Sequence, residues 1–302
     1  MGRFRSPASQ ARYVVGQKLA IGRPSHGQKG QDGRIHSLGT ARTYEDSLTG
    51  VAAYIANQQV DTIGRGLASL TPEIAQNYLE MRSEQVGQKQ LDKDRQAIQV
   101  LLGSKLPVIK SELDQVHQSR AYTREQIQLI AGAQSRLNSL ATKIAANAGL
   151  RAHELLTLMP LSERKVSSHR TWSEERFEGR ADVRMYSVTG KGGLTREVAI
   201  DAGLAAILEA VRLSEPRQVT DRKIYYAQYY DLAGGKRWSD SFSKASLREL
   251  GWSSGAHGVR HTYAQERMRA LQGLGYLYDV ALGIVSQEMG HFRPDISEVY
   301  LR

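Results

Sequence analysis

Residues 257–268 read HGVRHTYAQERM, and residues 290–302, at the end of the chain, read GHFRPDISEVYLR. The first stretch places a histidine three positions before an arginine, and the second places a histidine nine positions before Tyr300. Arginine, histidine and tyrosine together supply anion binding, proton transfer and a nucleophile. The meaning of the two stretches depends on the rest of the chain.

The histidine and arginine spacing is weak evidence when it stands alone. The same chain contains a second instance, His117 and Arg120 in HQSR, so about one match is expected by chance at this composition. Histidines at 257 and 261 also have the spacing of zinc ligands, but Gly258 stands where a zinc protease carries its glutamate base. We therefore expect no metal site here, and the neighbouring motifs must decide the function.

The bulk composition favours an intracellular protein that binds a polyanion. The chain has 302 residues, enough for about two domains, and no cysteine, which excludes a disulfide framework and a thiolate site. No apolar stretch is long enough to span a bilayer, and the first residues lack the apolar run of a secretory signal. The net charge of +10 makes nucleic acid the leading partner, with a solvated basic surface as the plainer alternative.

Positive charge is concentrated near the N-terminus. Residues 1–40 contain seven basic residues and only Asp32 as an acid. We expect residues 1–43 to form a flexible basic arm that lies along DNA phosphates. The arm residues expected to bind DNA are Arg3, Arg5, Arg12, Lys18, Arg23, Lys29 and Arg34.

Two folded domains are expected after the arm. Residues 44–112 have helical periodicity, with Thr71 before Pro72 as a helix start and Gly103 as a helix end, which predicts a small helical domain. Residues 113–121 form a polar linker. Residues 122–302 open with a capping-box pair, Thr123 and Gln126, and continue as a second domain of mixed α/β but mainly helical character.

Two further motifs in the second domain contain charged residues that suit chemistry at a phosphate. GLRAHELL at residues 149–156 carries Arg151 and, one helical turn later, Glu154. TGKGGLTREV at residues 189–198 connects two β-like runs and predicts a hairpin with Lys191 at its tip. Each residue alone is more often a solvated surface residue, so their order along the chain is what matters.

The ordered motifs resemble those of the tyrosine recombinase, or phage integrase, family. GLRAHELL resembles its first arginine box, TGKGGLTREV its lysine hairpin, HGVRHTYA its second arginine box, and MGHFRPDISEVY its terminal histidine and tyrosine box. The resemblance is close over about residues 120–300, whereas residues 45–110 match the core-binding domain only in size, class and position. It implies an α-helical core-binding domain followed by a mainly helical catalytic domain with a small β-hairpin or sheet.

The resemblance also implies a role for each matched residue. The catalytic set is Arg151, Lys191, His257, Arg260, His291 and Tyr300. Tyr300 would attack a DNA phosphate, the two arginines would bind its nonbridging oxygens, and Lys191 would protonate the departing 5′ oxygen. A tyrosine with an ordinary pKa of about 10 is a poor nucleophile, so His257 is a candidate base and His291 a phosphate donor. Glu154 would orient the arginines, and His261 is expected to play a supporting role.

The expected function is a site-specific DNA recombinase or integrase that uses a 3′-phosphotyrosyl intermediate, with no metal, ATP or other cofactor. Its partners would be double-stranded DNA, three further copies in a homotetramer, and accessory DNA-bending or directionality proteins. The expected location is the cytoplasm, bacterial or phage-associated, on DNA. A type IB topoisomerase and a non-catalytic DNA-binding regulator are the alternatives. Many relatives continue beyond the tyrosine to dock on a neighbour, so a chain ending at Arg302 is expected to couple through another surface or to be naturally short.

Overall fold

A computed structural model gives the structure of the chain and describes residues 5–22, 33–57, 66–113, 119–190, 192–222 and 224–301. The chain divides into two compact units, Met1–Val116 and His117–Arg302, which are described separately. The division falls inside the expected linker, residues 113–121. No helix in the described ranges is both long enough and apolar enough to cross a membrane.

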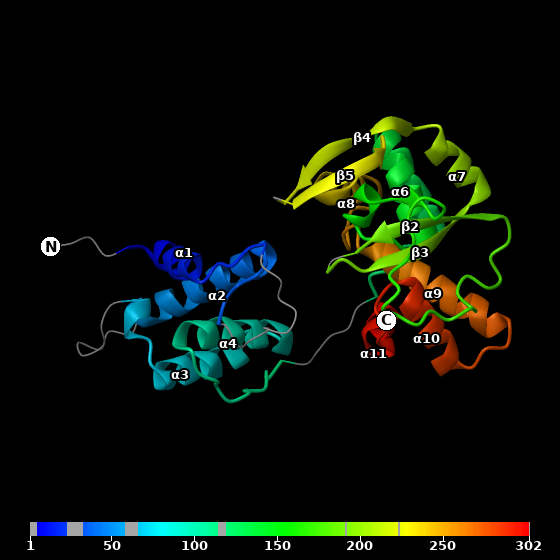
Figure 1. Ribbon diagram of the computed structural model, residues 1–302. Helices are drawn as coiled ribbons and strands as arrows, with labels where there is room; N and C mark the ends of the chain where they lie inside the picture. Colours follow the sequence, from blue (N-terminus) through cyan, green and yellow to red (C-terminus); the bar gives the residue numbers. More distant parts are fainter. Residues whose placement is uncertain are drawn as a thin grey trace. The chain divides into compact units, whose positions relative to one another are not determined.

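The first unit is built from helices (Figure 1). Its elements are α1 Pro7–Gln17, α2 Leu38–Asn57, the 3-10 turn η1 Leu67–Ser69, α3 Pro72–Ser83 and α4 Gln88–Leu102. The expected helix signals are confirmed, because the Thr71 side chain accepts a hydrogen bond from the Ile74 amide and Gly103 adopts the left-handed conformation after α4. The core contains an apolar stripe of α2, namely Leu48, Val51, Ala52 and Ile55.

The prediction of a flexible arm over residues 1–43 is wrong for its described part. Residues 7–17 form α1, which starts at Ser6 and Pro7 and packs against α2. Ala11 and Val15, one helical turn apart, are buried in the core of the first unit. Apolar burial at this spacing fixes the segment, and Arg12, the basic residue between the two apolar positions, stays exposed. The excess of basic residues predicted a solvated arm, and the short amphipathic helix within it was not predicted.

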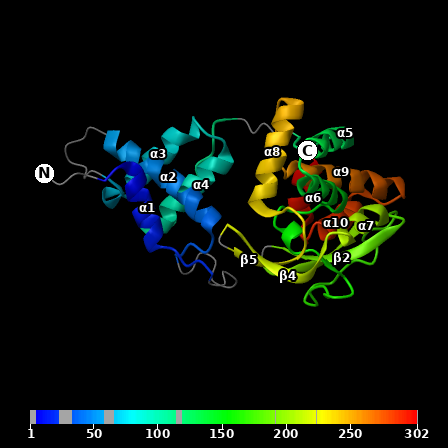
Figure 2. The same ribbon diagram turned by 90° about the horizontal axis from the view of Figure 1, so that it is seen from above.

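The second unit is mainly helical with two small antiparallel sheets (Figures 1 and 2). Its helices are α5 Arg124–Gly132, α6 Arg136–Ala148, α7 Ala202–Glu209, α8 Gly235–Leu250, α9 Gly258–Gly273, α10 Tyr278–Glu288 and α11 Pro294–Glu298, with 3-10 turns η2 Glu154–Leu156 and η3 Val299–Leu301. Its strands are β1 Met159–Pro160, β2 Val183–Thr189, β3 Thr195–Asp201, β4 Arg212–Asp221 and β5 Ile224–Tyr230. The predicted fold class agrees with this architecture.

Local signals in the second unit behave as the sequence predicts. Thr123 and Gln126 form a reciprocal capping box at the start of α5. The predicted hairpin is β2 and β3, which pair in antiparallel register from Val183 opposite Asp201 to Thr189 opposite Thr195. The short strand β1 extends this sheet on the β2 side.

Two clusters of buried apolar side chains in the second unit stabilise the helices and strands that contain the motifs. The larger cluster surrounds α6, which packs against α5, α8, α9 and β3. The smaller cluster joins α9 and α10 and includes Tyr300 among its buried members. Tyr300 is therefore packed against α9, which carries Arg260 and begins directly after His257, and against α10, which ends shortly before His291.

Candidate active site

Tyr300 lies at the centre of three histidines. Its side chain belongs to η3 and is only 8% exposed. The ring centroids of His261, His291 and His257 lie 4.7, 5.2 and 5.3 Å from the Tyr300 centroid. The structure thus brings His257 and His261, about forty positions earlier in the sequence, against Tyr300.

His257 contacts the tyrosine hydroxyl directly. It precedes the first turn of α9, and its Nε2 atom lies 2.9 Å from the Tyr300 hydroxyl oxygen. Burial of part of the ring, with the nearby Arg260 and His261, lowers the pKa of His257 to about 3, although the residue retains an exposed edge. The ring is therefore neutral near pH 7, and so low a pKa makes it a weak proton acceptor in the DNA-free protein.

His261 follows one helical turn later and closes the other side of the tyrosine ring. It is 5% exposed, and its Nδ1 atom is buried without a hydrogen-bond partner within the described ranges. Burial and the charge of Arg120 lower its pKa to about 4. His261 contacts the Tyr300 ring but takes no part in the hydrogen bond between His257 and the Tyr300 hydroxyl.

Arg260 lies fully buried beneath the tyrosine. Its guanidinium carbon is 5.5 Å from the Tyr300 ring centroid, and its Nη2 atom bonds the Met289 carbonyl and His291 Nε2, each at 3.2 Å. Its Nη1 atom donates to the Gly149 carbonyl. Burial, together with the charge of Arg151, lowers its pKa to about 10, so it remains charged near neutral pH.

Glu154 organises the arginines. Its fully buried carboxylate bonds Arg151 Nη1 at 2.7 Å and Arg151 N at 2.8 Å, and Arg260 Nη1 lies 3.7 Å away. Burial by itself would raise the pKa of Glu154, but Arg196, Arg151 and Arg260 lower it far below its ordinary value. The carboxylate stays ionised and orients guanidinium groups that would otherwise repel one another.

Arg196 is a member of this network that the sequence analysis missed. It lies on β3, is 1% exposed, and donates from Nη2 to Glu154 Oε2 at 2.9 Å and from Nη1 to the Glu288 carbonyl at 2.6 Å. It thereby links the motif of Arg151 to the end of α10. The alternation of β3 places residue 196 on the same inward face as Val198 and Ile200, and this was the available signal.

His291 is held by both ring nitrogens. Its Nε2 atom faces Arg260 Nη2, which only donates, so Nε2 accepts and the neutral ring carries its proton on Nδ1. Nδ1 then donates to the Ser297 hydroxyl at 2.9 Å. Burial and the charge of Arg260 lower the pKa of His291 to about 3. In this state Nε2 accepts a hydrogen bond, so the expected donation to a phosphate requires a different tautomer or a proton gained with the substrate.

Two glycines let the motifs approach closely. Gly149 has φ of 62°, and a Cβ there would lie 2.5 Å from the Tyr263 ring, so glycine suits this position, whose carbonyl accepts from Arg260. A Cβ on Gly258 would lie 2.4 Å from the Arg120 carbonyl oxygen. These contacts explain a glycine two residues before Arg151 and another directly after His257.

Lys191 lies outside the described residues. The hairpin that carries it is described on both sides of that position, with Gly190 N bonding the Leu194 carbonyl at 2.8 Å. A Cβ on Gly190 would lie 3.3 Å from Glu154 Oε1. The base of the hairpin therefore lies beside the Glu154 and Arg151 pair.

The arm residues that are predicted to bind DNA belong to the first unit. Arg3, Arg23 and Lys29 lie outside the described residues. Arg5 stacks on Tyr13 at 4.7 Å and Arg12 is exposed on α1, whereas Lys18 and Arg34 lie where the chain leaves α1 and returns to it. The structure presents Arg5, Arg12, Lys18 and Arg34 from a folded segment.

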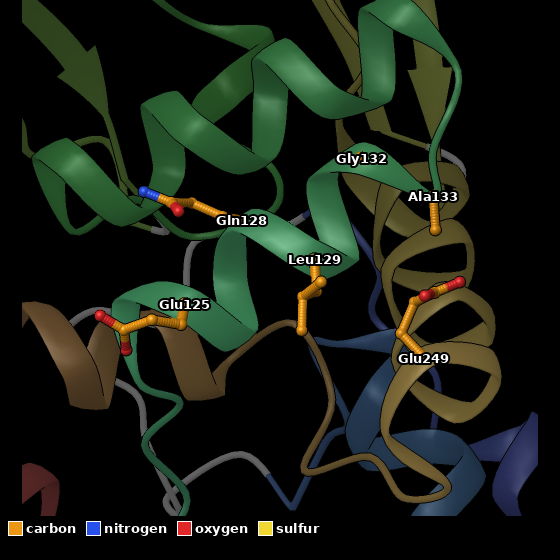
Figure 3. A pocket seen from close by; sticks show the side chains of 6 residues that line it. All are labelled: Glu125, Gln128, Leu129, Gly132, Ala133 and Glu249. Atoms are coloured by element: carbon orange, nitrogen blue, oxygen red, sulfur yellow. The ribbon is translucent and has the colours of Figure 1, made fainter.

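A shallow surface pocket lies between α5 and the end of α8 (Figure 3). Its lining residues are Glu125, Gln128, Leu129, Gly132, Ala133 and Glu249. None of the candidate catalytic residues lines it, so this pocket contributes nothing to the proposed chemistry.

Comparison with solved structures identifies the fold. The XerH site-specific recombinase bound to difH substrate matches with a TM-score of 0.55 at 15% identity, covering 98% of this chain and 90% of that chain. A lambda integrase tetramer bound to a Holliday junction matches at 0.53 and 12%, covering 88% and 72%. The Tn1549 transposon integrase in complex with transposon right end DNA matches at 0.52 and 11%, covering 97% and 95%.

No family model matches the sequence, and no curated protein matches it either. At 11 to 15% identity the likeness rests on the course of the backbone. The sequence motifs and the structural likeness nevertheless point to the same group of proteins. The chain has the fold of the tyrosine recombinases.

Proposed function

We propose that this protein is a site-specific DNA recombinase that cuts and rejoins DNA strands through a covalent link to Tyr300. The observation that carries the proposal is the 2.9 Å contact between the Tyr300 hydroxyl and His257 Nε2, directly above the buried Arg260. A nucleophile, a neutral base and an anion-binding group are thus adjacent. The fold of the structural neighbours supports the same reaction class.

The proposed reaction conserves the energy of the phosphodiester. The Tyr300 oxygen attacks the scissile phosphorus while His257 accepts the phenolic proton, and the bond from phosphorus to the 5′ oxygen breaks. Arg260 and Arg151 stabilise the charge on the nonbridging oxygens. Lys191 protonates the leaving 5′ oxygen. The 5′ hydroxyl of a partner strand then attacks the phosphotyrosyl link and releases Tyr300, so the rejoining step requires no ATP.

Phosphate binding requires a movement at the nucleophile. The Tyr300 ring covers Arg260, whose side chain is fully buried and whose Nε atom has no partner within the described part of the chain. A phosphate oxygen reaches this guanidinium only after the tyrosine ring shifts. We propose that the incoming DNA strand displaces the ring and brings Nε into use.

Exchange between two duplexes cleaves four strands and therefore needs four copies of Tyr300. A homotetramer on double-stranded DNA is the assembly we propose, in line with the lambda integrase tetramer on a Holliday junction. Accessory DNA-bending or directionality proteins are proposed as further partners, and the DNA-bearing cytoplasm as the location.

The decisive test is capture of the covalent intermediate. DNA fragments carrying candidate sites would be nicked so that the cleaved end diffuses away, which traps a protein–DNA adduct. The wild type should form an adduct, Tyr300→Phe should form none, and the matched control Tyr225→Phe, at an exposed ring, should behave as wild type.

DNA affinity of the Tyr300→Phe protein should stay within about threefold, because phosphate contacts dominate binding. DNA binding without any adduct would instead identify a non-catalytic regulator. Relaxation of supercoiled DNA without strand exchange between two sites would identify a topoisomerase.

A further inference from the structure

The backbone around His291 has an unusual conformation. Gly290 and Phe292 both have positive φ, 73° and 55°, so two left-handed residues flank the histidine. Glycine adopts this conformation freely, but an aromatic residue does so only when its surroundings hold it there. The contacts of Phe292 therefore determine whether His291 keeps its place.

A long loop holds the Phe292 ring. The loop, residues 161–182, connects β1 to β2. Its Trp172 packs edge-to-face on Phe292, with ring centroids 4.7 Å apart and planes at 64°, and Arg170 lies 5.1 Å from the Phe292 ring centre. Trp172 is itself fixed, because Arg176 stacks on it at 4.6 Å and its indole NH donates to the Ser167 carbonyl at 3.1 Å.

The same loop is also bound to the residues just before His291. The Ser173 amide donates to Gln287 Oε1 at 2.7 Å, and the Phe177 amide donates to Glu288 Oε1 at 2.8 Å. Arg267 clamps the Glu288 carboxylate from α9 with two bonds of 2.9 Å. The loop therefore contacts the chain on both sides of His291, at positions 287–288 and at position 292.

We infer that this loop positions His291, and that Trp172 does so through its contact with Phe292. Trp172 has no contact with Tyr300, Arg260 or His257 among its aromatic, cation and hydrogen-bond contacts, so it is a positioning residue. Loss of its ring frees Phe292 to leave the left-handed conformation. The His291 ring then moves away from Arg260 Nη2 and Ser297 Oγ, which it now contacts at 3.2 and 2.9 Å. The catalytic consequence rests on the proposed function, whereas the position of His291 does not.

The first test measures the hydrogen bonds of the His291 ring. In DNA-free protein, nitrogen-resolved NMR of the histidine rings reports the bonds at Nδ1 and Nε2, with the His291 signals assigned by their loss in His291→Asn. Trp172→Ala should shift them, Trp172→Phe should preserve them, and Glu174→Ala, an exposed change in the same loop, should leave them unchanged. Gln287→Leu, which removes the acceptor for the Ser173 amide, is a second variant if Trp172→Ala does not fold.

The second test measures the rate of adduct formation by the same proteins. Trp172→Ala should lower the rate of adduct formation at saturating DNA by at least about tenfold, because displacing a catalytic group by about an ångström costs up to about 100-fold. The dissociation constant for DNA should change by less than about twofold, since His291 is one contact among many phosphate contacts. Trp172→Phe should restore most of the rate.

The outcomes separate this inference from the proposed function. Unchanged His291 signals in Trp172→Ala, or in Gln287→Leu if Trp172→Ala does not fold, would overturn the inference. If Trp172→Ala shifts the His291 signals but the wild type forms no adduct, the positioning role is supported and the recombinase function is rejected. Wild-type adduct formation with an equally fast Trp172→Ala protein would overturn the catalytic part.

Discussion

The Nε2 atom of His257 lies 2.9 Å from the hydroxyl oxygen of Tyr300, although 43 positions separate the two residues. The packing of η3 against α9 creates this contact, because the turn that carries Tyr300 lies along the start of that helix. Gln265 on α9 strengthens the arrangement by donating to the Tyr300 carbonyl at 3.2 Å. The His257 imidazole and the Tyr300 hydroxyl are thus paired in the DNA-free protein.

Replacing His257 by glutamine should slow adduct formation at least about 100-fold, the usual contribution of a positioned general base. Glutamine retains a hydrogen-bonding side chain but accepts no proton at neutral pH. The measurement is single-turnover cleavage of nicked DNA at saturating protein, with DNA affinity determined in parallel. A rate equal to that of the wild type would assign proton removal to another group.

Arg196→Met should destabilise the second unit by about 3 to 5 kcal/mol, the cost of leaving a buried carboxylate without a main partner. Adding Glu154→Gln should increase this loss, because Arg151 and the buried Arg260 then lose their counter-charge. Urea unfolding of the single and double variants measures both effects. Arg217→Met, which breaks an exposed pair with Asp231, should change stability little and is the matched control. Equal effects of the two arginine changes would contradict the structural role of Arg196.

Lys191→Ala should slow cleavage of ordinary DNA but should cleave DNA with a 5′-bridging sulfur nearly as fast as the wild type. Sulfur leaves without a proton, so a general acid becomes dispensable on that substrate. Cleavage rates of the two substrates by the two proteins give the answer. A similar defect on both substrates would place Lys191 in DNA binding.

Stability should fall as the pH decreases from about 6.5 towards about 4. His257, His261 and His291 have folded-state pKa values of about 3, 4 and 3, below the ordinary value of about 6.5. The unfolded chain then binds more protons than the folded one, which favours unfolding. Urea midpoints at about pH 7 and about pH 4.5 test this, and His261→Gln should lose less stability than the wild type over that interval. An equal loss in both proteins would show that the pKa of His261 is not lowered in the folded protein.

Changes to α1 should separate charge from packing. Replacing Arg5, Arg12 and Lys18 by glutamine should leave stability nearly unchanged but lower the salt dependence of DNA binding, by roughly 0.9 in logarithmic slope for each phosphate that is no longer neutralised. Deleting residues 1–20 should instead unfold part of the first unit, because Ala11 and Val15 leave its core. Circular dichroism and DNA titration over a salt series distinguish the two results. A truncated protein as stable as the full chain would contradict the packing of α1.

Much of the candidate site could be predicted from the sequence because its signals are short. A tyrosine, two arginines and two histidines stand in motifs of a few residues, and their order along the chain resembles that of the tyrosine recombinase family. Helix boundaries at Thr71, Gly103 and Thr123 were equally readable, since a cap depends on residues within one turn.

Only the tertiary structure revealed the residues whose role depends on distant partners. Arg196 lies in a strand, 42 residues from Glu154 and 92 from Glu288, and no local pattern specifies either contact. Trp172 and Phe292 are in contact although 120 positions separate them. The sequence of α1 predicted a basic arm, and only the structure shows that its Ala11 and Val15 are buried in the core. Caps and turns are fixed by hydrogen bonds between neighbours in the chain. Burial of a side chain and its choice of partner are fixed by which elements pack together, a property of the whole fold.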